Sequence, residues 1–214
     1  FCGRAKQRNL SYLIVMPIAI NGSGSITGIS AGGLPDGCVT ADDLASGVGG
    51  KILQVKQTVK VNTFSTGSSS FVDITDFYVD ITPNSASNKF LVSIDLKIGP
   101  SNTTAGAPFA QLVRVIGGTS LDIYKGTADG NKTSTSWGRE DNPRDNYAGF
   151  ELLPLHLSFL DSISGVWTSG SIRYKIQMAD KNSNTNFVNR VSNESDGVQY
   201  PRTASTITVM EVAP

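Results

Sequence analysis

Histidine occurs once in this chain, as His156, and cysteine occurs twice, as Cys2 and Cys38. One histidine excludes the metal centres that are built from several imidazole ligands. The two cysteines lack the close spacing of a zinc or redox motif, so we interpret them as unpaired small residues. A chain of 214 residues can bury a sufficient core without disulfides.

Charge is also scarce, and its two signs cancel. Charged residues make up 17% of the chain, with 18 basic and 18 acidic side chains, whereas an average soluble domain has roughly 25%. No cluster of lysine and arginine with interleaved aromatic residues is present. These features argue against a nucleic-acid partner and against binding to an anionic membrane.

Long apolar runs are missing as well. The run at residues 10–20 is interrupted by Pro17 and is shorter than the about 20 residues that a transmembrane helix needs. We therefore expect no membrane insertion. Residues 1–15 carry three basic side chains beside a short apolar run, which resembles a signal peptide, and we interpret them as a processed leader or an upstream segment.

Signals of catalysis are few. Neither a Walker loop nor a dinucleotide fingerprint occurs, so no cofactor is expected. Residues 28–32 match the G-x-S-x-G pattern around Ser30, but they lie in a glycine-rich stretch without the strand and helix that this chemistry requires. We interpret His156, between Leu155 and Leu157, as a hydrogen-bonded residue in the wall of a strand.

Carboxylates do occur in the loops, at Asp129, Glu140, Asp141 and Asp145. They could line a calcium site, but no EF-hand spacing supports one. Two of them could serve in glycoside hydrolysis, since the fold and not the sequence sets that spacing. A polysaccharide depolymerase is thus a remote alternative, and we expect no enzyme.

Small polar residues are abundant instead. The chain contains 25 Ser, 18 Thr, 14 Asn and 22 Gly, which favour short strands joined by turns. The clearest strand is at residues 90–98, where every second residue is apolar: Phe90, Val92, Ile94, Leu96 and Ile98. Such alternation predicts a strand with one buried face.

Similar signals recur from residue 51 to the C-terminus. Strands are expected at residues 52–61, 71–81, 109–116, 121–125, 172–178, 187–191 and 203–212. In the first of these, Val55, Val59 and Val61 lie opposite Lys56 and Lys60. We expect the strand at 187–191 to pair with that at 172–178 across a hairpin, and Gly117-Gly118 to form another hairpin turn.

The stretch 150–160 is apolar on nearly every residue, which predicts a strand buried on both sides, and Pro154 places it at an edge or a bulge. About nine strands and no long helix predict an all-β fold, an antiparallel β-sandwich of jelly-roll type over residues 51–214. Residues 16–50, where nine of the residues 21–50 are glycine, predict an extended N-terminal arm.

The segment 126–149 is a long loop with scarcely any aliphatic residue. Loops of that length tend to be functional, and aromatic and arginine side chains are enriched at interfaces. Its candidate contacts for a receptor or partner are Trp137, Arg139, Asp141, Arg144 and Tyr147. Alternatively, Trp137 folds back onto the sandwich. The turn at 180–186 is a second candidate tip.

Several phrases together resemble the fibre-like virion proteins of tailed phages, particularly of marine phages. They are the glycine-rich opening at 16–29, the stretch 33–45, the phrase at 50–55, the phrase at 81–92 and the ending at 200–212. The resemblance implies an N-terminal arm that docks on the particle and a β domain displayed outward as a homotrimer. The anchoring residues would be Ile18, Ile20, Ile26, Ile29, Leu34, Val39 and Leu44.

These observations predict a non-enzymatic virion protein of fibre or adhesin type, located on the capsid or tail surface. Its partners would be itself, other virion proteins through the arm, and a glycan or protein of the host surface. The main alternative is a capsid or tail decoration protein without receptor binding. A cellular trimeric ligand of the C1q or tumour-necrosis-factor type is compatible with the architecture alone.

Overall fold

The computed structural model describes residues 51–101, 107–139 and 148–214, which belong to one compact unit spanning Gly50–Pro214. The segments proposed as leader (1–15) and arm (16–50) lie outside the described residues. In the described ranges, the sole helical element is the 3-10 turn η2 (Ala148–Phe150). No helix among the described residues is long and apolar enough to cross a membrane.

In the part of the chain that the structure describes, eleven strands form two antiparallel sheets. Eight of them build the body of the fold, and the short strands β2, β7 and β10 extend it. The bounds are β1 (Ile52–Lys60), β2 (Phe64–Thr66), β3 (Val72–Ile81), β4 (Lys89–Gly99), β5 (Pro108–Ile116), β6 (Thr119–Ile123), β7 (Trp137–Gly138), β8 (Leu153–Ser162), β9 (Ile172–Asp180), β10 (Asn186–Val188) and β11 (Ser205–Val212).

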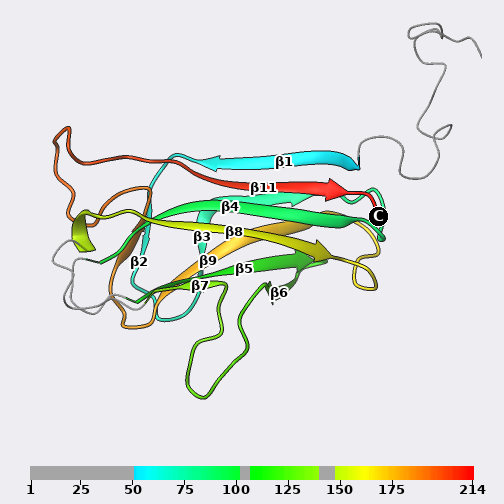
Figure 1. Cartoon of the computed structure of the whole chain (residues 1–214), viewed down its shortest axis with the longest axis horizontal. Helices are drawn as coiled ribbons and strands as arrows, with labels where there is room; N and C mark the ends of the chain where they lie inside the picture. Colours follow the sequence, from blue (N-terminus) through cyan, green and yellow to red (C-terminus); the bar gives the residue numbers. More distant parts are fainter. Residues whose placement is uncertain (1–50, 102–106, 140–147) are drawn as a thin grey trace, which may run out of the picture. The chain divides into compact units, whose positions relative to one another are not determined.

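The strand order is that of a jelly roll. Sheet A contains β1, β11, β4 and β8 as successive neighbours (Figure 1), and β10 and β2 continue it beyond the end of β4. Sheet B contains β3, β9, β5 and β6, and β7 pairs with β5. Among the eight main strands, the first thus pairs with the last, and the second with the last but one. Two sheets of four strands in this order form the double Greek key of the jelly roll, so the expected fold class is confirmed.

The apolar core lies between the sheets. The alternate residues of β4 predicted to be inward are all at most 2% exposed. Sheet B contributes the alternating residues of β9 and the inward side of β3 and β5. The largest fully buried side chains are Phe77, Ile81, Phe90, Leu96, Ile98, Leu112, Leu155, Ile163, Ile172, Tyr174, Ile176 and Met178.

A bulge in β3 allows two residues of opposite parity to enter this core. Ile74 and Phe77 are both buried, although side chains three apart in a regular strand point to opposite faces. Between them, Asp76 adopts φ 57°, and the pairing of β3 with β9 shifts register between Asp73 and Tyr78. The extra residues of this irregular bulge turn Phe77 back toward the core.

The β5–β6 connection is the expected hairpin. Gly117 and Gly118 form its two-residue turn with φ 56° and 83°, a left-handed conformation that glycine adopts without steric cost. Ile116 and Thr119 are the last pair of the ladder. This hairpin lies at the edge of sheet B and forms one wall of a pocket described below.

Two strand predictions need correction. The stretch around β8 is not buried on both sides: its residues alternate, and Leu160 is 50% exposed. Pro154 does lie on an edge strand, since among the described strands β8 pairs with β4 alone. The apolar residues on its outward side therefore face solvent within this chain.

The strand at 187–191 was expected to pair with 172–178, and this is wrong. β10 pairs with β2 and β4 in sheet A, whereas β9 belongs to sheet B. The buried carboxylate of Asp180 explains the crossing, because it accepts hydrogen bonds from the backbone of Asn182 and Asn184 and from the Asn186 side chain. The turn at 180–186 is thus a carboxylate-organised corner that carries the chain from one sheet to the other.

Candidate functional site

Several surfaces of the sandwich are candidates for binding, and we describe them from their residues upward. They are the loop between β6 and β7, a pocket at the edge of sheet B, and the outward faces of the two sheets. Among the described residues, no group of three or more His, Cys, Asp or Glu side chains is placed to hold a metal ion.

The loop between β6 and β7 projects from the sandwich (Figure 1). Residues 124–133 are all exposed. The loop is nevertheless internally bonded: the Gly126 N–H donates to the Thr135 carbonyl at 3.2 Å, and the Lys132 N–H to the Asp129 carbonyl at 3.1 Å. A Lys132–Asp129 ion pair adds to these bonds. Such a loop offers a preformed surface, which lowers the entropy cost of binding.

Trp137 does not lie at the tip of this loop. It forms β7 with Gly138, pairs with Ala110 on β5, and packs partly buried against the core. Trp137 therefore folds back onto the sandwich, and its contact with a receptor stays a prediction. Arg139 follows it, with its N–H donating to the Pro108 carbonyl at 3.0 Å and its guanidinium 3.6 Å from Glu151. The other candidates, Asp141, Arg144 and Tyr147, lie outside the described residues.

The candidate anchor residues Ile18, Ile20, Ile26, Ile29, Leu34, Val39 and Leu44 also lie outside the described residues, as do Ser30 and both cysteines. The structure places His156 on the outward face of β8, where its side chain is 64% exposed and its Nδ1 lies 3.2 Å from Asp95. It is therefore a surface residue with a carboxylate neighbour.

A group that sequence reasoning missed connects the two sheets. Arg114 on β5 donates from Nη1 to both oxygens of Asp161 on β8, at 2.7 and 2.9 Å, and to the Ser162 carbonyl. The Tyr174 hydroxyl donates to Asp161 at 2.8 Å. Arg114 and Asp161 are 7% and 4% exposed. Burial beside Asp161 raises the pKa of Tyr174, so the phenol stays protonated and donates.

The signal for this group was present in the sequence. Arg114 follows the buried Leu112 at a spacing of two, so it belongs to the inward side of a strand. A charge at such a register needs a buried partner. The identity of that partner, Asp161, depends on the packing of β8 opposite β5, which no local pattern specifies.

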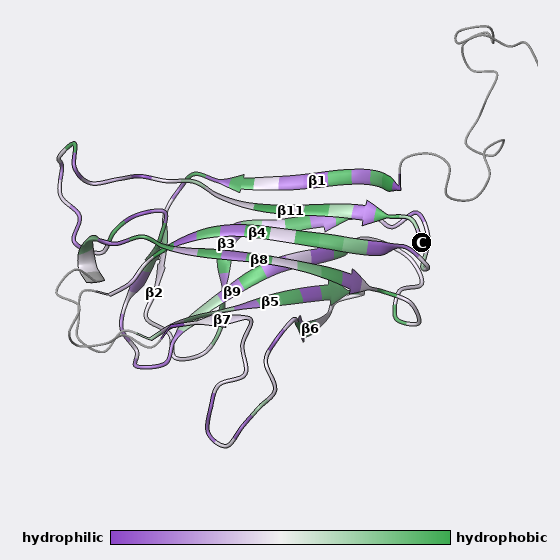
Figure 2. Cartoon of the chain, in the orientation of Figure 1, coloured by the Kyte–Doolittle hydropathy of each residue, from purple (hydrophilic) through white to green (hydrophobic). Residues whose placement is uncertain are grey.

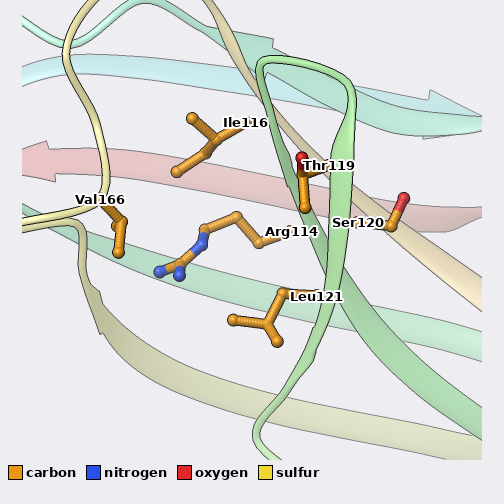
Figure 3. Close-up of a pocket in the computed structure, with 6 residues that line it drawn as sticks. All are labelled: Arg114, Ile116, Thr119, Ser120, Leu121 and Val166. Carbon is orange, nitrogen blue, oxygen red and sulfur yellow. The ribbon is translucent and has the colours of Figure 1, made fainter.

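The guanidinium of Arg114 forms the floor of a pocket of about 330 Å³. Figure 3 shows it reaching between Leu121 of the β5–β6 hairpin and Val166 of the turn after β8. Leu121 and Val166 are each 53% exposed. The Arg114 charge is already neutralised by Asp161, so this pocket suits a small, uncharged and largely apolar group better than an anion.

The outward face of sheet B is covered by paired polar side chains. Arg173 forms a bidentate pair with Asp80 at 2.8 and 2.7 Å, and its guanidinium lies 3.8 Å from the centre of the Tyr78 ring. Lys175 and Gln177 both donate to Asp73. These side chains satisfy one another within the chain.

The outward face of sheet A is different, because one row of it is apolar. Val55 on β1 pairs with Met210 on β11, Met210 with Leu91 on β4, and Leu91 with Leu160 on β8. We call these four residues the apolar row. Val55 and Leu160 are 52% and 50% exposed, and Met210 and Leu91 are partly exposed.

Comparison with known proteins yields little beyond the fold. No protein-family model and no curated protein matches the chain. A structure of infectious bursal disease virus, Gx strain, is similar over 75% of this chain and 37% of its own, with 12% identity and a TM-score of 0.38. The VP2 subviral particle of the same virus is similar over 75% and 41%, with 15% identity and a TM-score of 0.32. The chain thus spans about two fifths of these proteins, and likeness at this level does not extend to function.

Proposed function

We propose that this chain is a non-enzymatic structural component of a phage virion, of fibre or adhesin type. Residues 16–50 anchor it to the particle, and the β domain is displayed for attachment to the host surface. The phrases shared with fibre-like virion proteins support this proposal. So does the jelly roll, a fold used by viral capsid and lectin domains, although a fold alone does not define function.

The observation that carries the adhesin role is the projecting loop between β6 and β7. It is exposed over residues 124–133 and held by its own hydrogen bonds, as expected for a recognition loop on a rigid scaffold. We propose that the exposed part of this loop makes the host contact, and Trp137, at the base of the loop, remains a candidate contact. The ligand would be a polar group, such as a glycan, because the loop offers mainly hydroxyl, amide and charged side chains.

This role is tested by replacing residues 127–133 with two glycines and measuring adsorption of the virion to its host. We expect particles that assemble normally and adsorb at least about tenfold more slowly, in line with the loss of a binding hot spot. The matched control replaces Val166, which is exposed in the turn after β8, with serine. Unchanged adsorption of the loop variant would contradict the adhesin role.

The anchoring role has a separate test. A chain lacking residues 1–50 should fold and stay soluble but should no longer join the particle, because the described sheets have their own core. Incorporation of the truncated chain would show that the arm is not the anchor.

A second function, decoration of the capsid or tail, is favoured by the apolar row of sheet A, which suits contact with another subunit better than contact with water. Locating the density of the protein on the intact virion separates the two functions. A position at a distal tip supports attachment, whereas a position flush with the shell and buried between subunits supports decoration.

A further inference from the structure

The apolar row crosses the whole width of sheet A at one level. Its four members come from four successive strands and lie in direct register. Two further residues of β1, Leu53 and Val59, are 44% and 51% exposed on the same strand, and apolar residues recur along β1 in Figure 2 although it is an edge strand. A contiguous apolar stripe on an outward sheet face is uncommon in a chain that functions alone.

Hydrogen bonds hold β1 so that its valine side faces outward. From its other side, the Gln54 amide donates to the Thr82 carbonyl at 2.7 Å, the Thr58 hydroxyl to the Tyr78 carbonyl at 2.6 Å, and the Lys60 ammonium to the Thr75 carbonyl at 2.8 Å. The strand therefore turns its polar side toward β3, and Lys60 is only 3% exposed. A slip of one residue would bury the valines but would break all three bonds.

The surroundings of the apolar row fit contact with another copy of the same surface. The next level of the sheet is uncharged, with Gln57, Thr208, Ser93 and Ser158 in register. Two such surfaces can approach without placing like charges together, and the chain as a whole has no net charge to repel a copy of itself. A strongly charged partner would find no complementary charge in these two levels.

The rim of this face is also suitable, and the face itself is small. Four strands spaced about 4.8 Å apart and seven residues of about 3.3 Å each give a face of roughly 19 Å by 23 Å, or about 440 Å² per partner. This area lies in the range of weak interfaces, which bury less than about 1,200 Å² in total. Charged side chains flank it, with Lys89 before the apolar row and Asp95 with His156 after the uncharged level. An apolar centre with a polar rim is the usual anatomy of an interface.

We propose that the outward face of sheet A, centred on the apolar row, is the surface on which a second copy of this chain packs. This inference goes beyond the proposed virion role, and contact between two copies of the same surface would form a two-fold pair.

The test measures the mass of the full chain by sedimentation equilibrium over a range of micromolar concentrations. The wild type is compared with the double variant Val55→Lys and Leu160→Lys, which places two unpaired charges at the ends of the apolar row. We expect the wild type to be oligomeric and the double variant to associate at least ~100-fold more weakly, because burying an unpaired ammonium is costly. The matched control is Val166→Lys, which changes an equally exposed apolar residue away from this face and should leave the mass unchanged.

A milder double variant, Val55→Thr and Leu160→Thr, keeps strand propensity and serves if the lysines impair folding, which circular dichroism monitors. An oligomer that persists in folded variants would overturn the assignment of the face while self-association stands. A wild type that is monomeric at every concentration would overturn both the face and the self-association. Loss of association in the Val166→Lys control would also contradict the assignment.

Discussion

The outward faces of the two sheets present different side chains to the solvent. Sheet B covers its outward face with charges that are paired within the chain, such as Arg173 with Asp80. Sheet A carries the apolar row, whose members have no polar group to satisfy in water. The polar groups of the first surface are paired within one chain. Covering the apolar residues of the second surface would lower the free energy, because it removes them from water. Alternation of side chains along a strand is compatible with either kind of outward face. The two-residue period alone therefore does not show which face of a strand is exposed to solvent.

The inward sides of the two sheets, by contrast, contact each other, and the Arg114–Asp161 ion pair connects sheet B with sheet A. We expect the largest loss of stability when this pair is broken. Asp161→Asn should destabilise the domain by about 3–5 kcal/mol, since it leaves a buried guanidinium without a counter-charge. Urea unfolding followed by tryptophan fluorescence measures the change.

The matched variant on the outward face of sheet B is Asp80→Asn, which removes an equally short but exposed partner of Arg173. Its cost should stay below about 1 kcal/mol, because solvent screens exposed pairs. Equal losses in the two variants would mean that the connecting pair is no more important than the surface one.

The second expected effect compares two glycines, one in each sheet. An added Cβ at Gly99, at the end of β4, would lie 2.0 Å from the Arg190 carbonyl oxygen, which is backbone. At Gly138, in β7, it would lie 2.5 Å from the Phe109 ring, a side chain that can rotate. Gly99→Ala should therefore cost roughly 3 kcal/mol and Gly138→Ala about 1 kcal/mol. Thermal unfolding of both variants checks the order, and a reversed order would refute it.

Acid should weaken sheet A through an inward carboxylate. Burial acts to raise the pKa of Glu211, but hydrogen bonds from Asn88, Gln54 and the Asn84 backbone outweigh it, so the folded pKa is below the usual value. This contribution is fully present above the ordinary glutamate pKa of about 4.3 and is lost as pH falls through the lower folded value. We expect a loss of order 1 kcal/mol, measured by urea unfolding between pH 5 and pH 2.

Glu211→Gln should lower stability at pH 7 and flatten this acid dependence. In sheet B, the pKa of Asp73 is also lowered: partial burial raises it, and hydrogen bonds from Lys175 and Gln177 outweigh that effect. Because Asp73 is more exposed, Asp73→Asn should alter the acid dependence less. An unchanged acid profile in Glu211→Gln would remove Glu211 as the cause.

The smallest expected effect is the coupling on the outward face of sheet B. A double-mutant cycle of Asp80→Ala and Arg173→Ala should give about 0.5 kcal/mol at low salt, and less at high ionic strength because exposed pairs are screened. A coupling that does not fall as salt rises would contradict its assignment to a screened ion pair.

Much of the fold followed from local patterns. The alternation at 90–98 identified β4 and its buried side, and Pro154 identified an edge, because proline cannot donate to a second neighbour. Far less of the candidate site could be predicted from these local patterns. Trp137 was placed in a loop by its neighbours, yet it pairs with β5 because the ladder at Phe109 and Ala110 was open to it. The valines of β1 alternate as predicted, but three hydrogen bonds to β3 turn them outward.

By itself, the sequence determined that this chain is built of strands, where most of them run, and that it is uncharged overall, since side-chain period and composition are local properties. Only the tertiary structure decided which strands share a sheet, that Arg114 meets Asp161, and that Val55, Met210, Leu91 and Leu160 align in one row. Those results depend on pairing register between distant segments, such as that between Gln54 and Glu211, which are 157 residues apart. Such register is set by the packing of the whole domain and leaves no mark in any single segment.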